Sequence, residues 1–220
     1  MDEKNANLAK LQQVIVSQRV GADLAAQARQ LVFGEGSPDA EVVFVGEAPG
    51  KKEDETGRPF VGAAGRLLDE LLASISLDRS AVYITNIVKY RPPNNRDPLP
   101  EEKQAFLPFL WQQIAIINPK VVVTLGRHSM RCFQPELKIG QAHGIPQQLA
   151  WDESVSTDDR SILTLLPLYH PAAALYNGGL RQTLFADMQQ LATMLGGDEE
   201  AQDRNVKKSI EITIGNSKEK

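Results

Sequence analysis

Cysteine is nearly absent from this chain, since Cys132 is the single one in 220 residues. One thiol excludes a disulfide within the chain and any metal centre that needs several thiolates. Long apolar runs are also missing, because none approaches the ~18 residues that span a membrane. The first residues lack the basic and then apolar pattern of a signal peptide. We therefore expect a cytoplasmic, monomeric protein without membrane contact.

An excess of basic charge is absent too: the formal net charge is −4 and the pI is about 5.5. No overall positive field attracts nucleic acid, although a local basic groove on an acidic protein still can. Two nucleotide-binding signatures are missing as well, the Gly-x-Gly-x-x-Gly fingerprint and the Walker P-loop. Their absence disfavours a generic doubly wound nucleotide-binding module.

What the chain does contain is an alternation of short apolar runs with helical patterns. Strands are predicted over residues 41–46, 81–88, 120–126 and 161–168, and helices over 62–74, 101–117, 127–133 and 182–195. Strands that alternate with helices over short connections favour a parallel sheet covered on both faces. The predicted fold class is therefore α/β, a three-layer α/β/α arrangement around a central four-stranded parallel sheet.

A single domain is predicted over residues 1–195, and it begins with an N-terminal helical segment, residues 1–31. That segment has apolar residues at helical spacing and a break near Gly21, after which Asp23 is the candidate N-cap of a second short helix. Residues 196–220 are charged and poor in large apolar groups, so we expect a disordered tail.

Polar side chains stand where the predicted strands end. Glu47, Asn86 and His170 lie at the tips of three strands, and Phe60 lies in the loop after the first. Each has an ordinary alternative: Asn86 as a turn cap, His170 as a satisfied turn histidine, Phe60 as core. The carboxyl ends of parallel strands meet at one edge, however, where such folds bind ligands. A carboxamide, an imidazole and an aromatic face there suit a planar heterocycle.

Five short motifs together resemble family 4 uracil-DNA glycosylases. They run in the right order between about Leu24 and Leu191, and only the full set is specific. The motifs are Gly-Glu-Ala-Pro-Gly at 46–50, Gly-Arg-Pro-Phe-Val-Gly at 57–62, Thr-Asn-Ile-Val-Lys at 85–89, Arg-Pro-Pro-Asn-Asn-Arg at 91–96 and His-Pro-Ala-Ala at 170–173. The resemblance implies a four-stranded parallel sheet with flanking helices, and an enzyme that flips uracil out of DNA and hydrolyses its N-glycosidic bond.

The resemblance also implies a role for each pocket residue. Phe60 would stack on the flipped uracil, and Asn86 would read its O4 and N3 edge. His170 would donate to uracil O2 as negative charge develops there. Glu47, with Glu53 as a second candidate, would orient the water or stabilise the sugar cation. Three further positions match the pocket or its loops: Gly46, Ala48 and Asn95.

Contacts to DNA are implied by the same comparison. The loop of residues 172–177, which includes Ala173, would push into the duplex, with Leu175 as the wedge. Five basic residues are candidate phosphate contacts: Lys89, Arg91, Arg96, Arg127 and Arg181.

One family feature is missing. Members usually hold a four-iron, four-sulfur cluster on four cysteines, and the corresponding positions here are Arg19, Ala22, Tyr90 and Phe106. Thiolate ligation at these positions is excluded. We therefore predict no cofactor and no metal site. Tyr90 and Phe106 would fill the space of the cluster, with the Arg19–Ala22 segment closing over them.

Two readings of the function stay open. Because the pocket residues are kept while the cluster ligands are not, an active glycosylase without a cluster is favoured. The alternative is a catalytically weak or inactive DNA-binding relative of the same fold. A relative that binds uracil covalently carries a basic insertion with a histidine after the Phe60 loop. Here Ala63 and Ala64 follow that loop directly, so we set this reading aside.

Overall fold

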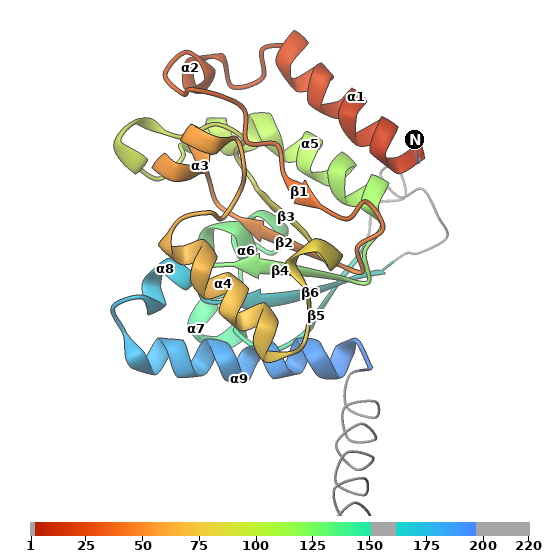
Figure 1. Cartoon of the computed structure of the whole chain (residues 1–220), viewed down its shortest axis with the longest axis vertical. Coiled ribbons are helices and arrows are strands. Elements are labelled where there is room, and N and C mark those ends of the chain that lie inside the picture. Colours follow the sequence, from red (N-terminus) through yellow and green to blue (C-terminus); the bar gives the residue numbers. More distant parts are fainter. Residues whose placement is uncertain (1–2, 151–161, 197–220) are drawn as a thin grey trace, which may run out of the picture.

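The computed structural model describes residues 3–150 and 162–196, and a six-stranded sheet forms its centre. Its strand order is β1-β3-β2-β4-β6-β5 (Figure 1). The strands are β1 (Glu35–Gly36), β2 (Val42–Gly46), β3 (Tyr83–Asn86), β4 (Val121–Leu125), β5 (Gln147–Ala150) and β6 (Ile162–Leu168). The four central strands, β3, β2, β4 and β6, are parallel, which confirms the predicted core of the sheet.

The two edge strands add to the four predicted strands. The sequence predicts a sheet edge or hairpin at Ile145, Pro146 and Trp151; β5 begins directly after Pro146, and Trp151 lies outside the described residues. β1 pairs antiparallel with β3, and β5 pairs antiparallel with β6. β1 has only two residues, in a stretch expected to be a turn, so no periodicity marked it. β5 alternates half-buried and exposed side chains, as an edge strand does.

Helices cover both faces of the sheet. The described helices of four or more residues are α1 (Glu3–Ser17), α2 (Ala22–Ala25), α3 (Lys51–Thr56), α4 (Ala63–Ser74), α5 (Pro100–Ile117), α6 (Arg127–Phe133), α7 (Ile139–Ala142), α8 (Pro171–Ala174) and α9 (Gly178–Met194). Short 3₁₀ turns, Arg79–Ala81 and Pro93–Asn95, precede β3 and follow it. Figure 1 shows α1 and α5 on one side of the sheet and α9 on the other.

The sheet divides the core into two apolar clusters. Val43 and Val45 of β2 face α1, α5 and α6, whereas Val42 and Phe44 face α4 and α9. All four are fully buried, so β2 is covered on both faces, as a central parallel strand must be. The alternation confirms the three-layer arrangement.

The N-terminal helical segment is present, but its second helix is shorter than residues 23–30, the span that the sequence predicts. α2 ends at Ala25, and its N-cap is Gly21, which makes no side-chain capping bond. The expectation that Asp23 is the N-cap is therefore wrong, because Asp23 already lies inside the first turn. The predicted domain limits at 1 and 195 stay a prediction, and the predicted tail falls almost entirely outside the described residues.

None of the helices in the described part of the chain is long and apolar enough to cross a membrane.

Candidate active site

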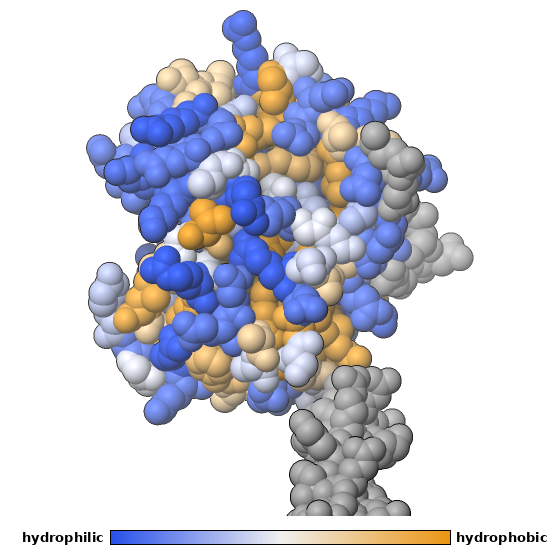
Figure 2. Space-filling model, in the orientation of Figure 1, coloured by the Kyte–Doolittle hydropathy of each residue, from blue (hydrophilic) through white to orange (hydrophobic). Residues whose placement is uncertain are grey.

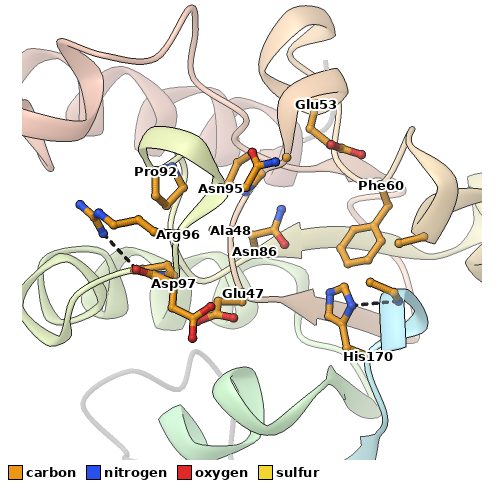
Figure 3. A pocket seen from close by; sticks show the side chains of 15 residues that line it. Glu47, Ala48, Glu53, Phe60, Asn86, Pro92, Asn95, Arg96, Asp97 and His170 are labelled. Carbon is orange, nitrogen blue, oxygen red and sulfur yellow. Dashed lines mark hydrogen bonds between the residues drawn. The ribbon is translucent and has the colours of Figure 1, made fainter. Parts of the chain in front are cut away.

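A pocket of about 390 Å³ opens where the parallel strands end at their carboxyl edge. Its lining includes Glu47 and Ala48 after β2, Asn86 at the end of β3, and His170 and Ala172 after β6. Phe60 and Asn95 come from the loops between these elements. Figure 3 shows the side chains of Phe60, Asn86 and His170 around one common space. The convergence predicted from three strand ends is therefore present.

Asn86 supplies a buried hydrogen-bond acceptor that no group among the described residues uses. Its residue is 2% exposed, and its Oδ1 is buried without a hydrogen-bond partner among the described residues. An unmet buried acceptor costs roughly 1–3 kcal/mol, so its position at the pocket wall calls for a partner that is not part of the protein, such as a ligand or water. The alternative role of Asn86 as a turn cap has no bond to support it in the described part of the chain.

A buried lysine holds the backbone of Asn86. Lys89 is 0% exposed, and its Nζ donates to the Asn86 carbonyl at 2.8 Å, to Thr85 Oγ1 at 2.7 Å and to Gln113 Oε1 at 2.6 Å. Burial lowers the pKa of Lys89 well below its usual range. The prediction that Lys89 contacts phosphate is wrong, because its ammonium lies inside the protein. The role of Gln113 on α5 could not be predicted from the sequence, because its contact with Lys89 joins residues 24 positions apart.

Phe60 is held in a strained backbone conformation above the pocket. Its φ is +50°, and its ring is 7% exposed with its centroid 5.9 Å from that of His170. Glu53 Oε1 accepts from the backbone N–H groups of Val61 at 2.9 Å and Gly62 at 2.8 Å. Those bonds fix the Phe60 loop at the start of α4. Left-handed strain in a non-glycine residue persists only where its surroundings impose it, often at functional sites.

His170 points its second ring nitrogen into the pocket. Its Nδ1 accepts from the Ala172 backbone N–H at 3.1 Å, which makes His170 the N-cap of α8 (Figure 3). In the neutral ring, the proton therefore lies on Nε2. Burial, and in second place the nearby His128, lower the pKa of His170 to about 4. Near neutral pH the ring is an uncharged donor toward the pocket.

Glu47 lies in a polar network that sequence reasoning missed. Its Oε1 is 3.2 Å from Lys103 Nζ and 3.5 Å from His128 Nδ1, and His128 Nε2 is 3.3 Å from Asp97. Arg127, a predicted phosphate contact, donates to His128 Nε2 at 3.0 Å. Burial lowers the pKa of His128, although Glu47 acts in the opposite direction. These residues come from four segments, so no local spacing reveals them.

Ligand atoms of Glu47, Asp97 and His128 lie within 4.8 Å of one another, close enough to be tested as a metal site. The ammonium group of Lys103 already stands at Glu47, however, at 3.2 Å. A cation beside it would meet that charge directly, so we treat the cluster as an ion-pair network around Glu47.

The loop after β3 is fixed by arginines expected to contact DNA. Arg96 makes two bonds to Glu102, at 2.8 and 2.6 Å, and lowers the pKa of that carboxyl group. Arg91 Nε donates to Asn95 Oδ1 at 2.7 Å, and Asn95 has a φ of +55°. Arg96 is thus already paired, whereas Asn95 lies at the pocket rim with its oxygen occupied.

The other basic side chains near the pocket differ in whether a carboxylate already pairs with them. Arg181 pairs with Glu70 and lies over the Phe185 ring, 5.3 Å from its centroid. Lys51 and Lys52 begin α3 next to the pocket mouth, are exposed and pair with no described carboxylate. Two consecutive lysines directly after the Gly-Glu-Ala-Pro-Gly motif are a sequence signal for phosphate contact, although they were not among the predicted contacts. Figure 2 shows hydrophilic side chains around the hollow between α3 and α8.

The fold and pocket define a class: an α/β protein with a polar pocket at the carboxyl edge of its parallel strands. The family model described as the uracil DNA glycosylase superfamily matches residues 33–192. The chain belongs to that superfamily. The match covers all pocket residues named above.

Relatives agree with the match. A protein of Sulfurisphaera tokodaii named type-4 uracil-DNA glycosylase is 48% identical over 161 residues, 73% of this chain and 72% of its own. Proteins of the same name are 43% identical in Archaeoglobus fulgidus, over 79% of this chain and 86% of theirs, and 41% in Thermotoga maritima, over 82% and 93%. The resemblance to family 4 is confirmed.

The four positions that the resemblance matched to the family's iron–sulfur ligands, Arg19, Ala22, Tyr90 and Phe106, carry side chains that do not fit a cluster. They offer a guanidinium group, a methyl group, a phenol and a phenyl ring, and none supplies a thiolate. Phe106 is fully buried and its ring packs edge-on against Tyr90, with centroids 6.1 Å apart. Gly21 has a φ of +66°, and a Cβ there would come within 2.5 Å of the Phe106 ring. The packed rings of Tyr90 and Phe106 therefore fill the space between these four residues.

Gly46 gives a direct test of the pocket. A Cβ at Gly46 would lie 2.3 Å from Asn86 Oδ1 and 2.6 Å from Phe60 Cζ, closer than such atoms approach. We expect Gly46→Ala to displace one of these side chains and to lower uracil release by about 10²-fold, since misplacement of about 1 Å can cost that much. Steady-state excision with matched circular dichroism spectra checks this. Gly140→Ala, where a Cβ meets only the Tyr169 hydroxyl at 3.8 Å, is the control. Full activity of Gly46→Ala would contradict the assigned pocket.

Proposed function

We propose that this protein is a uracil-DNA glycosylase that flips uracil out of DNA and hydrolyses its N-glycosidic bond without an iron–sulfur cluster. The main observation in support is the arrangement of three groups in the pocket. The buried Oδ1 of Asn86, which has no partner among the described residues, lies in one pocket with the ring of Phe60 and the donor nitrogen of His170. Membership of the superfamily and the names of the relatives support the same activity.

Uracil recognition rests on the edge and the face of the ring. The flipped base stacks on Phe60, while Asn86 Oδ1 accepts from N3–H and the amide NH₂ donates to O4. Cytosine presents an acceptor at N3 and a donor at its exocyclic amine, so both bonds would be lost. Gly46 and Ala48 leave room for the ring because they carry little or no side chain.

Departure of the base needs a donor at O2. When the bond between C1′ and N1 breaks, its electron pair leaves with uracil and negative charge develops on O2. His170 Nε2–H is fixed by the bond that Nδ1 accepts, so no reorganisation precedes the reaction. Because the pKa of His170 is about 4, the group acts as a neutral donor rather than as an acid that transfers its proton.

The positive charge left on the sugar is opposite in sign to the carboxylate of Glu47. We assign to Glu47 the stabilisation of that cation and the orientation of the water that adds to C1′. The oxygen of the water forms the new C1′–O bond, and one of its protons is lost to solvent, which balances the uracil anion that leaves. Lys103 and His128 hold the carboxylate in place. Glu53 was a second candidate for this role. Its Oε1 is used by two backbone N–H groups, so we assign it to positioning Phe60.

DNA contacts are proposed for the exposed cations around the pocket. Lys51, Lys52, Arg91 and Arg127 can reach phosphates without breaking a carboxylate pair. Arg96 and Arg181 are less available, because each is paired with a glutamate. Ala173 is exposed on α8, not on a loop, and we propose that this short helix contacts the DNA strand. The monomeric state and cytoplasmic location stay predictions.

The lowered pKa of His170 predicts a pH dependence of stability. An unfolded histidine titrates near about 6.5. The unfolded state therefore binds more protons than the folded state between about pH 4 and 6.5, and the free energy of unfolding rises with pH across that window. We expect His170→Asn, which keeps an N-cap acceptor, to flatten this rise. Urea unfolding at several pH values checks it. An NMR titration with a His170 pKa above 6 would contradict the assignment.

The proposed activity is tested with labelled oligonucleotides that carry one uracil opposite G, opposite A or in a single strand. We expect alkali-labile sites at uracil and none where cytosine or thymine replaces it. DNA binding without base release would indicate the alternative function, a relative that kept the fold and lost the reaction.

A further inference from the structure

Lys89 lies in the interior with its Nζ surrounded by oxygen atoms. Besides its bonds to the Asn86 carbonyl, Thr85 Oγ1 and Gln113 Oε1, Nζ stands 5.7 Å from the centroid of the Phe33 ring. None of the carboxylates in residues 3–150 and 162–196 forms an ion pair with it. Because a buried charge without a counter-ion is costly, the lysine is either a neutral amine or a charge held by these oxygens.

The hydrogen bonds around Nζ decide between the two forms. The Phe33 carbonyl can only accept, so the Gln113 amide must turn its Nε2 toward that oxygen, at 3.0 Å, and its Oε1 toward Lys89. Thr85 has one hydroxyl proton, and the 2.8 Å contact between Thr85 Oγ1 and the Phe33 carbonyl uses it. All three partners of Nζ are therefore acceptors. An amine has two protons to donate and an ammonium has three, so these bonds select the charged form, although burial opposes it.

This charge stands behind one wall of the pocket. Asn86, whose carbonyl accepts from Nζ, lines the pocket with its side chain. The lining arginine, Arg96, is already paired with a glutamate, and the His170 ring is uncharged near neutral pH. The carboxylates of the lining are those of Glu47, Glu53 and Asp97. A base that leaves as an anion therefore meets a lining rich in negative charge, and Lys89 supplies a positive charge that no described carboxylate cancels.

We propose that the buried ammonium group of Lys89 stabilises the negative charge that develops on the leaving uracil, acting across Asn86 without touching the base. The proposal rests on the proposed function and adds a positioning residue to it. A fixed charge in the interior acts more strongly than one in water and needs no reorganisation during the reaction. Lys89 keeps all three protons, so uracil departs as an anion and takes its proton later from solvent.

A change of the leaving base separates the effect of charge from that of packing. Fluorine at C5 withdraws electrons, so the anion of 5-fluorouracil needs less stabilisation by the protein. We expect Lys89→Met to lower kcat on uracil in a duplex by roughly 10- to 100-fold, with a several-fold smaller loss on 5-fluorouracil. Lys89→Gln, which keeps two donor protons without the charge, should show the same difference. Equal losses on the two bases would overturn the proposal.

Tyr83→Phe is the matched control for a disturbed network. The Tyr83 hydroxyl accepts from Gln113 Nε2 at 3.0 Å, one residue away from Lys89. Its removal takes one bond from the same network and leaves the charge in place. We expect a lower Tm, and any loss of kcat should be equal on uracil and 5-fluorouracil. A loss confined to uracil in Tyr83→Phe would trace the difference to the network rather than to the charge, and would also overturn the proposal.

The charge itself is measured on the wild type, independently of catalysis and of how the variants fold. In protein with nitrogen-15-labelled lysine, NMR counts the protons on Nζ, and we expect three near neutral pH. Two protons would refute the proposal. If the wild type releases uracil while the Lys89 variants lose both bases equally, the proposed function stands and the role of Lys89 fails. If the wild type releases neither base, the proposed function fails, and the proton count still decides whether the charge exists.

Discussion

His170→Asn and Asn86→Ala are each expected to lower the rate of uracil release by about 10²- to 10³-fold, the effect of removing one preorganised donor from a site where charge develops. The asparagine at position 170 keeps an oxygen for the Ala172 N–H but is too short to place a donor at uracil O2. The loss should therefore appear in kcat with little change in KM. Single-turnover excision from a uracil duplex measures it.

The two variants should differ in specificity. Asn86→Ala removes the edge that separates uracil from cytosine, so its residual activity should discriminate less between them. His170→Asn should keep full discrimination. A matched control is His143→Asn, because His143 lies outside the pocket and pairs with Asp187 at 2.8 Å. If His143→Asn lost as much activity as His170→Asn, the effect would be general destabilisation rather than loss of the donor.

Phe106→Ala is expected to lower the free energy of unfolding by about 3–5 kcal/mol, as for other buried aromatic residues. The ring is fully buried between Tyr90 and the Arg19–Ala22 segment, so its removal leaves a cavity at the position of the family's cluster. Phe106→Leu keeps most of the volume and should cost clearly less. Urea unfolding of the two variants beside the wild type checks this.

Activity distinguishes packing from a direct role in the reaction. Phe106 lies outside the pocket lining, so Phe106→Ala should retain kcat per folded molecule at a temperature where it stays folded. If Phe106→Ala lowered the free energy of unfolding by less than about 1 kcal/mol, packing of the Phe106 ring would not be what closes this region. The account of the missing cluster would then fail.

The central fold was predictable because its signals are local. Each parallel strand is a short, mainly apolar run, rich in β-branched residues in β2 and β4, and α4 shows its four leucines on one face, as expected for residues 62–74. Of the edge strands, β1 was missed because it has only two residues. β5 lies in the stretch predicted as a sheet edge or hairpin, and its bounds are set by its pairing with β6. Short helices such as α3 and α8 were also missed, since one or two turns carry no periodicity.

The site was predictable in part. Strand ends located Asn86, His170 and Glu47, because parallel strands deliver their carboxyl ends to one edge. The sequence did not reveal which charged residues point outward. Lys89 lies in a basic motif yet is fully buried, and Lys103 reaches Glu47 from another helix. Such contacts depend on packing across the sheet, which residue spacing does not encode.

The most direct test of the account measures uracil release and metal content on the same sample. Protein purified under anaerobic conditions is treated with a chelator, assayed for iron and sulfide, and then given a uracil-containing duplex. The account predicts sustained uracil release with iron far below one atom per chain. Stoichiometric iron and sulfide, with activity that is lost on their removal and restored on their return, would contradict it.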